Sequence, residues 1–141
     1  MNVQLQSGSN KEITVKFMEL QGWSLDVDVP ENMRIFITAR LQMTRMKCTK
    51  FNSVLVMCRN GADGSGLYIA ACNLIDSILT EQVVDVCMIV RRIRSNRTQF
   101  ITNKKQLHAL YEVATFFLSD FTKYHYVSTL PIRSKLRNCI E

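Results

Sequence analysis

The sequence lacks both a long apolar run and any set of cysteine and histidine residues at metal-ligand spacing. No stretch reaches the length of a membrane-spanning helix, and the N-terminal residues lack the basic start and apolar core of a signal peptide. The five cysteines are an odd number without zinc-like spacing, so we expect reduced thiols and no disulfide. His125 has no partner at metal spacing. These absences favour a cytoplasmic protein that holds no metal and no other cofactor.

Charge and composition place few further limits on function. The 141 residues are 47% hydrophobic, which is enough for the core of one globular domain. The formal net charge is +6, but lysine and arginine are spread along the chain, as on an ordinary solvated surface. Nucleic acid is therefore not an expected partner. We divide the chain into a flexible N-terminus at 1–12, a domain at 13–120 and a basic tail at 121–141.

The most informative stretch runs from Ser53 to Leu79, where a short apolar run meets three closely spaced glycines. Residues 54–57 are all apolar, which is typical of a strand buried on both faces. Cys58 and the glycine-rich loop follow, and then apolar residues recur at helical spacing. In such a unit the loop N–H groups and the helix N-terminus favour a bound phosphate and a thiolate. An inert cysteine beside an ordinary turn is the alternative interpretation.

The chain as a whole predicts an α/β fold with few strands and about four helices. We expect a strand at 13–20, followed by a helix from Pro30 to about Met46. A second helix follows the glycines, and Thr80 to Gln82 would cap a third. Asn103 and Gln106 form a predicted capping box that opens the last helix.

The glycine-rich loop resembles the signature loop of the protein tyrosine phosphatases, in which a cysteine is followed by five residues, an arginine, a serine or threonine, and a glycine. Cys58, Gly61, Ser65 and Gly66 match this pattern, but Gly64 stands at the arginine position. The resemblance implies that Cys58 holds the place of the catalytic nucleophile. It also implies a phosphate loop made of Arg59, Asn60, Gly61, Ala62, Asp63, Gly64 and Ser65.

A second departure from the family concerns its mobile Trp-Pro-Asp loop. Trp23 resembles the tryptophan of that loop and is the expected loop anchor, but Leu25 stands at the position of the general-acid aspartate. Asp26 and Asp28 follow closely, and either could replace the acid, although a helix cap is the plainer interpretation of Asp28. In the family register Gln106 falls on the glutamine that positions the hydrolytic water. Its plainer interpretation is the capping box.

The resemblance covers about Ile13 to Leu118 and corresponds to the C-terminal half of a phosphatase domain. It is nearest to the degenerate second, membrane-distal domains of receptor-type tyrosine phosphatases. It implies a partial phosphatase fold, in which the phosphate loop lies at the centre of a few-stranded mixed sheet. The implied partners are a phosphotyrosine protein or another phosphatase domain.

The two replaced positions predict a catalytically inactive pseudophosphatase with a binding or regulatory role in phosphotyrosine signalling. A residual cysteine-dependent tyrosine phosphatase is the alternative. A third hypothesis is an anion-binding module that uses the tail residues Arg133, Lys135 and Arg137.

Overall fold

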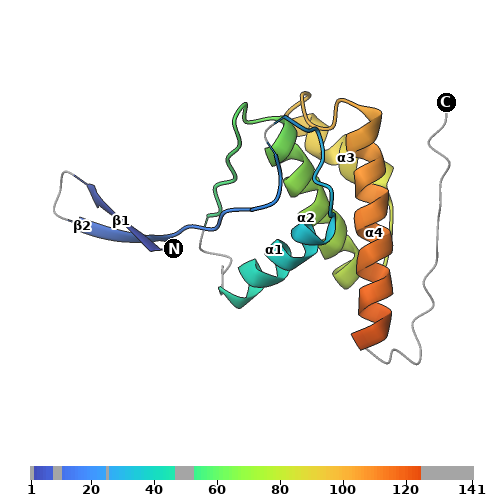
Figure 1. Cartoon of the computed structure of the whole chain (residues 1–141), viewed down its shortest axis with the longest axis horizontal. Helices are drawn as coiled ribbons and strands as arrows, with labels where there is room; N and C mark the ends of the chain where they lie inside the picture. Colours follow the sequence, from blue (N-terminus) through green and yellow to red (C-terminus); the bar gives the residue numbers. More distant parts are fainter. Residues whose placement is uncertain (1, 8–10, 25, 47–52, 125–141) are drawn as a thin grey trace.

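Helices and a separate two-stranded hairpin make up the part of the chain that the structure describes. The computed structural model describes residues 2–7, 11–24, 26–46 and 53–124. β1 (Asn2–Ser7) and β2 (Lys11–Lys16) pair antiparallel and project from the helices (Figure 1). β1 lies where we predicted a flexible N-terminus, and β2 ends at Lys16 rather than near residue 20.

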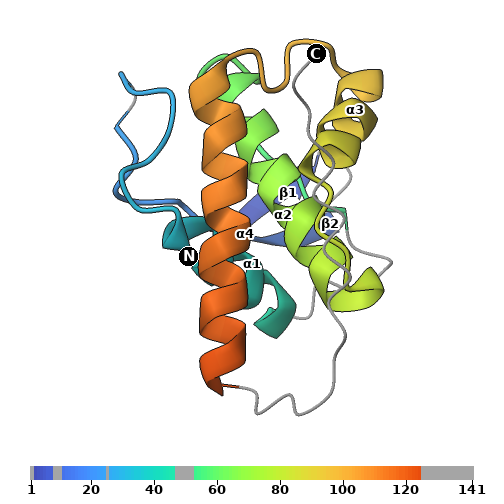
Figure 2. The same ribbon diagram turned by 90° about the vertical axis from the view of Figure 1, so that its right-hand side faces the viewer.

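The helix that follows the glycines, α2 (Asp63–Glu81), lies at the centre of the fold. It contacts α1 (Arg34–Arg45), α3 (Val86–Asn96) and α4 (Lys104–Tyr124), and Figure 2 shows α4 lying alongside it. Most of its recurring apolar positions are buried, whereas Ile69 is half-buried; the buried ones are Leu67, Ala70, Ala71, Leu74, Ile75 and Ile78. No helix in the described ranges is both long and apolar enough to cross a membrane.

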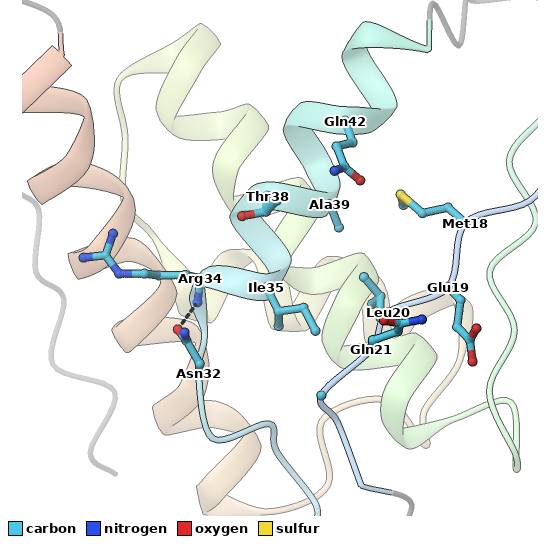
Figure 3. A pocket seen from close by; sticks show the side chains of 11 residues that line it. Met18, Glu19, Leu20, Gln21, Asn32, Arg34, Ile35, Thr38, Ala39 and Gln42 are labelled. Atoms are coloured by element: carbon cyan, nitrogen blue, oxygen red, sulfur yellow. Dashed lines mark hydrogen bonds between the residues drawn. The ribbon is translucent and has the colours of Figure 1, made fainter. Parts of the chain in front are cut away.

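α1 begins later than predicted, at Arg34 instead of Pro30. Pro30 is fully buried, so the chain first packs this ring into the core before the helix starts. The Asn32 side-chain oxygen then accepts the backbone N–H of Arg34 at 3.0 Å (Figure 3). Asp28 therefore does not cap the helix, and that prediction is wrong. Arg40 ties α1 to α2 through an ion pair with Asp76 at 2.6 Å.

The boundary between α2 and α3 also differs from the prediction. α2 continues through Thr80 to Glu81, and Gln82 ends it in a left-handed conformation with φ 57°. Asp85 caps α3, since its side chain accepts the backbone N–H of Met88 at 2.8 Å. Thr80 to Gln82 thus end one helix rather than open the next.

The start of α4 confirms the predicted cap. The Asn103 side-chain oxygen accepts the backbone N–H of Gln106 at 2.9 Å. The Gln106 Oε1 atom accepts the backbone N–H of Thr102 at 2.9 Å, rather than that of Asn103. The side-chain oxygens of Asn103 and Gln106 thus both accept backbone N–H groups at the start of α4.

The buried strand predicted at residues 54–57 is wrong. Residues 53–58 form neither helix nor strand, and Leu55 is 80% exposed. Within the described ranges no other segment pairs with these residues, and only Val56 of the apolar run packs against the core. The predicted mixed sheet is not confirmed, and the β component of the described fold is the hairpin alone.

The cysteines are not all reduced. Cys58 and Cys72 are free, whereas Cys87 is disulfide-bonded. The prediction that the chain forms no disulfide is therefore wrong for Cys87.

Gly66 is required by close packing between α2 and the loop before α4. A Cβ atom at this position would lie 2.7 Å from Cδ1 and 2.8 Å from Cγ of Phe100, whose ring is buried. We expect Gly66→Ala to lower the free energy of unfolding by about 1 to 3 kcal/mol, despite the higher helix propensity of alanine. Urea unfolding would measure this loss. Equal losses in the wild-type and Phe100→Leu backgrounds would contradict the explanation.

Candidate functional site

The predicted site residues gather around a groove of about 1080 Å³ between residues 15–28, residues 53–60 and the first turn of α2. Its lining includes Trp23 and most of the predicted phosphate loop: Cys58, Arg59, Asn60, Asp63, Gly64 and Ser65. A smaller hollow of about 450 Å³ lies between residues 18–22 and α1, and none of the predicted site residues line it (Figure 3). The larger groove is therefore the candidate site.

The thiol of Cys58 is half-buried at this groove and is poised to ionise. Burial alone would raise its pKa, but the Ser65 hydroxyl and the backbone groups of Ser65, Asn60 and Gly61 favour the thiolate and lower the pKa below 9.0. The Ser65 hydroxyl is buried and has no hydrogen-bond partner in the described part of the chain, so it is available to stabilise a thiolate. By contrast, burial raises the pKa of Cys72 to about 11.

Ser65→Ala is expected to raise the pKa of Cys58, because the thiolate loses a side-chain donor. Since the thiolate is the reactive form, alkylation should become slower at neutral pH and its pH midpoint should move upward. The rate of iodoacetamide labelling of Cys58, followed by mass spectrometry across pH, measures this change, with Cys72 as the unreactive internal reference. An unchanged pH profile would show that Ser65 does not act on the thiol.

The side chain of Asn60 fills part of the loop. Its Oδ1 atom accepts the backbone N–H groups of Ala62 at 3.0 Å and Asp63 at 3.1 Å, and lies 3.4 Å from the Cys58 Sγ atom. One carboxamide oxygen thus uses two of the loop N–H groups that an anion beside the thiol would need. The sequence showed only an asparagine in a loop, and asparagine commonly bonds the backbone two residues on.

Gly64, at the expected arginine position, leaves room that other residues occupy. A Cβ atom there would lie 3.2 Å from the Cβ of Cys58 and 3.6 Å from the Cη2 of Trp23. The Trp23 ring is held by its own contacts, because Nε1 donates to the Val27 carbonyl at 3.1 Å and the ring packs edge-on against Phe36. Trp23 thereby lies close to Gly64 of the predicted phosphate loop, and its role as a loop anchor stays a prediction.

The carboxylate of Asp63 and the amide of Gln106 meet beneath the loop. Asp63 accepts from the Asn60 side chain and, at 3.5 Å, from Gln106 Nε2. Gln106 is fully buried, does not line the groove, and uses its Oε1 on Thr102. These contacts favour its capping role, and the water-positioning role stays a prediction.

Arg97 is a cation near the loop whose position the sequence did not predict. A Cβ atom on Gly61, which has φ +67°, would lie 3.5 Å from one Arg97 guanidinium nitrogen. The guanidinium also lies over the Phe100 ring, 5.8 Å from its centroid. The sequence predicted only an ordinary solvated surface for the lysine and arginine residues, because it contains no information about how the end of α3 meets this loop.

The general-acid position, Leu25, lies outside the described residues. Asp26 and Asp28, the two nearby carboxylates, are exposed and both line the groove that contains Cys58. The third hypothesis, based on Arg133, Lys135 and Arg137, also concerns residues outside the described ranges.

Comparison with known proteins shows the family of the chain. The family model for protein-tyrosine phosphatases matches residues 1–116. Receptor-type tyrosine-protein phosphatase C of Mus musculus is 40% identical over 68 residues, which cover 48% of this chain and 5% of that protein. The Homo sapiens protein of that name is 28% identical over 71% of this chain and 8% of its own length. Tyrosine-protein phosphatase 69D of Drosophila melanogaster is 29% identical over 82% of this chain and 8% of its own length.

Proposed function

Because the chain belongs to the protein tyrosine phosphatase family, we propose that it is a pseudophosphatase, which keeps the phosphate loop for binding or regulation but does not turn over substrate. The observation that carries the proposal is the filling of the loop. Gly64 offers no guanidinium, Trp23 and Cys58 lie against it, and Asn60 takes two loop N–H groups.

The expected loss of rate is large. Removing a positioned general acid costs about 10² to 10⁴ in rate, and removing a preorganised transition-state donor costs about 10² to 10³. Leu25 and Gly64 stand at these two positions in the family register. Asp63 adds a carboxylate next to the place where a phosphate dianion would bind.

The chemistry of the site suggests its partners. The loop would bind a phosphotyrosine side chain of a partner protein, or the chain would pair with another phosphatase domain. Several relatives are receptor-type phosphatases. This similarity supports a cytoplasmic location and a role in phosphotyrosine signalling.

A residual cysteine-dependent phosphatase is the second candidate, and two observations favour it. The pKa of Cys58 is lowered, so a thiolate nucleophile is available. Asp26 and Asp28 line the same groove, so a carboxylic acid lies near the place where a leaving group would need a proton.

The test measures hydrolysis and binding on the same purified chain. We expect no hydrolysis of phosphotyrosine peptides above the rate of a Cys58→Ser variant. Thermal unfolding with vanadate, which mimics a transferring phosphoryl group, reports whether the loop still binds anions. Hydrolysis that disappears in Cys58→Ser would establish the phosphatase instead. Stabilisation by vanadate without hydrolysis would support the pseudophosphatase.

A further inference from the structure

Residues 86–111, from the start of α3 into α4, contain basic residues without any acidic ones. This part of the chain has six lysine and arginine residues and no aspartate or glutamate. All six side chains are exposed. We call these six residues the basic surface: Arg91, Arg92, Arg94, Arg97, Lys104 and Lys105.

The fold places the basic surface at one end of the helices. Figure 2 shows the end of α3 and the start of α4 at the same end of the molecule, where α2 also begins. The loop between α3 and α4 carries Arg97, whose guanidinium lies near Gly61 of the predicted phosphate loop. Cations from two helices and one loop thus share a single region of the surface.

The basic surface is not neutralised by the protein itself. Within the described part of the chain, no carboxylate forms an ion pair with any of its six residues. α1 provides a contrast, because it also lacks carboxylates of its own, yet Arg34 pairs with Asp120 and Arg40 pairs with Asp76. The fold therefore supplies carboxylates to two of the three arginines of α1 and to none of the basic surface.

Lys104 and Lys105 lie where a helix is least tolerant of cations. They are the first two residues of α4, and the first turn of this helix contains no acidic residue. The N-terminus of a helix carries a partial positive charge, so the two lysines are repelled by it and by each other. Helix stability does not explain these lysines, whereas a bound anionic group would offset the repulsion.

The directions of the arginines favour a flexible partner over a flat membrane. Successive residues of a helix advance by about 100°, so Arg92 and Arg94 project about 160° apart on α3, with Arg91 between them. A flat bilayer cannot contact all three, whereas a flexible polypeptide can bend around the end of the helix. Lipid binding would also gain nothing from insertion of apolar side chains. The apolar residues at 91–105 are all buried: Ile93, Phe100 and Ile101.

We propose that the basic surface binds an acidic segment of a partner polypeptide, rich in aspartate and glutamate. Such a segment supplies the carboxylates that the fold does not, and complementary charge also speeds association. The bound segment needs no phosphate group. The proposal therefore stands independently of anion binding by the phosphate loop.

The experiment measures binding of a fluorescent peptide, in which glutamate and aspartate alternate with glycine and serine, by fluorescence anisotropy at about 0.15 M salt. We expect the complete wild-type chain to bind it at micromolar concentrations. Lys104→Glu with Lys105→Glu should weaken binding by at least about tenfold, because two attractions become repulsions. The midpoint of thermal unfolding should not fall, since carboxylates are favourable at a helix N-terminus. This readout separates lost binding from lost folding.

Lys16→Glu with Arg45→Glu is the matched control, because both residues are exposed outside the basic surface and the net charge changes equally. This variant should keep the affinity for the peptide. Equal losses in the two double variants would overturn the proposal, because binding would then follow net charge alone. A wild-type chain that does not bind the peptide would overturn it as well, even if the chain bound phosphatidylserine vesicles or single-stranded DNA.

Discussion

Asn60→Ala is expected to raise the affinity of the loop for vanadate or phosphate by about tenfold or more. In the wild type the Asn60 Oδ1 atom accepts the N–H groups of Ala62 and Asp63. An anion that enters the loop must displace this oxygen before it can use those donors. Hydrogen bonds to charged groups contribute about 1.5 to 3 kcal/mol each, and a gain of about 1.4 kcal/mol is a tenfold change in affinity. Isothermal titration with vanadate measures the gain.

The thiol provides a second measurement on the same variant. Asn60 Oδ1 accepts the S–H group of Cys58 at 3.4 Å and so favours the protonated form. Its removal should lower the pKa of Cys58 further and speed alkylation at neutral pH.

Asn60→Asp is the matched control for the filling of the loop. It keeps the oxygen that occupies the loop and adds a negative charge, so anion binding should be weaker than in the wild type. If Asn60→Ala and Asn60→Asp both weaken vanadate binding, Asn60 organises the loop rather than blocks it.

The double substitution Asp63→Gly with Gly64→Arg is expected to raise phosphotyrosine hydrolysis by about 10² to 10³, the usual contribution of a positioned transition-state donor. The first change removes the carboxylate beside the loop, and the second restores the guanidinium at the family position. The Cβ of the new side chain would lie 3.2 Å from the Cβ of Cys58, so the loop must shift slightly to admit it. Turnover of a phosphotyrosine peptide under substrate excess measures the gain.

Two controls separate chemistry from packing in this variant. Asp63→Gly with Gly64→Gln places a long but uncharged side chain at the same position and should leave the rate near the wild-type value. Addition of Cys58→Ser to the arginine variant should abolish the gained hydrolysis. A folded arginine variant, verified by its thermal transition, without any gain would mean that the missing acid at Leu25 alone prevents turnover.

The family and the loop could be predicted from the sequence because both rest on local patterns. The spacing of Cys58, Gly61, Ser65 and Gly66 lies within one short segment, and the family match over residues 1–116 agrees with it. The helices were predictable for the same reason, since their apolar positions repeat within each segment. Asn103 was predicted correctly as a cap because its partner is three residues away.

The errors concern features that depend on distant residues. Residues 54–57 have the composition of a buried strand, but a strand is buried only when another segment pairs with it and covers it, and none does in the described ranges. The start of α1 depended on the burial of Pro30. The approach of Arg97 to Gly61, and of Gln106 to Asp63, joins residues far apart in the chain.

The sequence by itself therefore determined the family, the loop and the order of the helices. Only the tertiary structure decided how the loop is used: the Asn60 oxygen takes its N–H groups, Trp23 lies against Gly64, and the apolar segment before Cys58 stays exposed. The physical reason is that residue type and spacing set local conformation, whereas burial and hydrogen-bond partners depend on which distant segments the fold brings together.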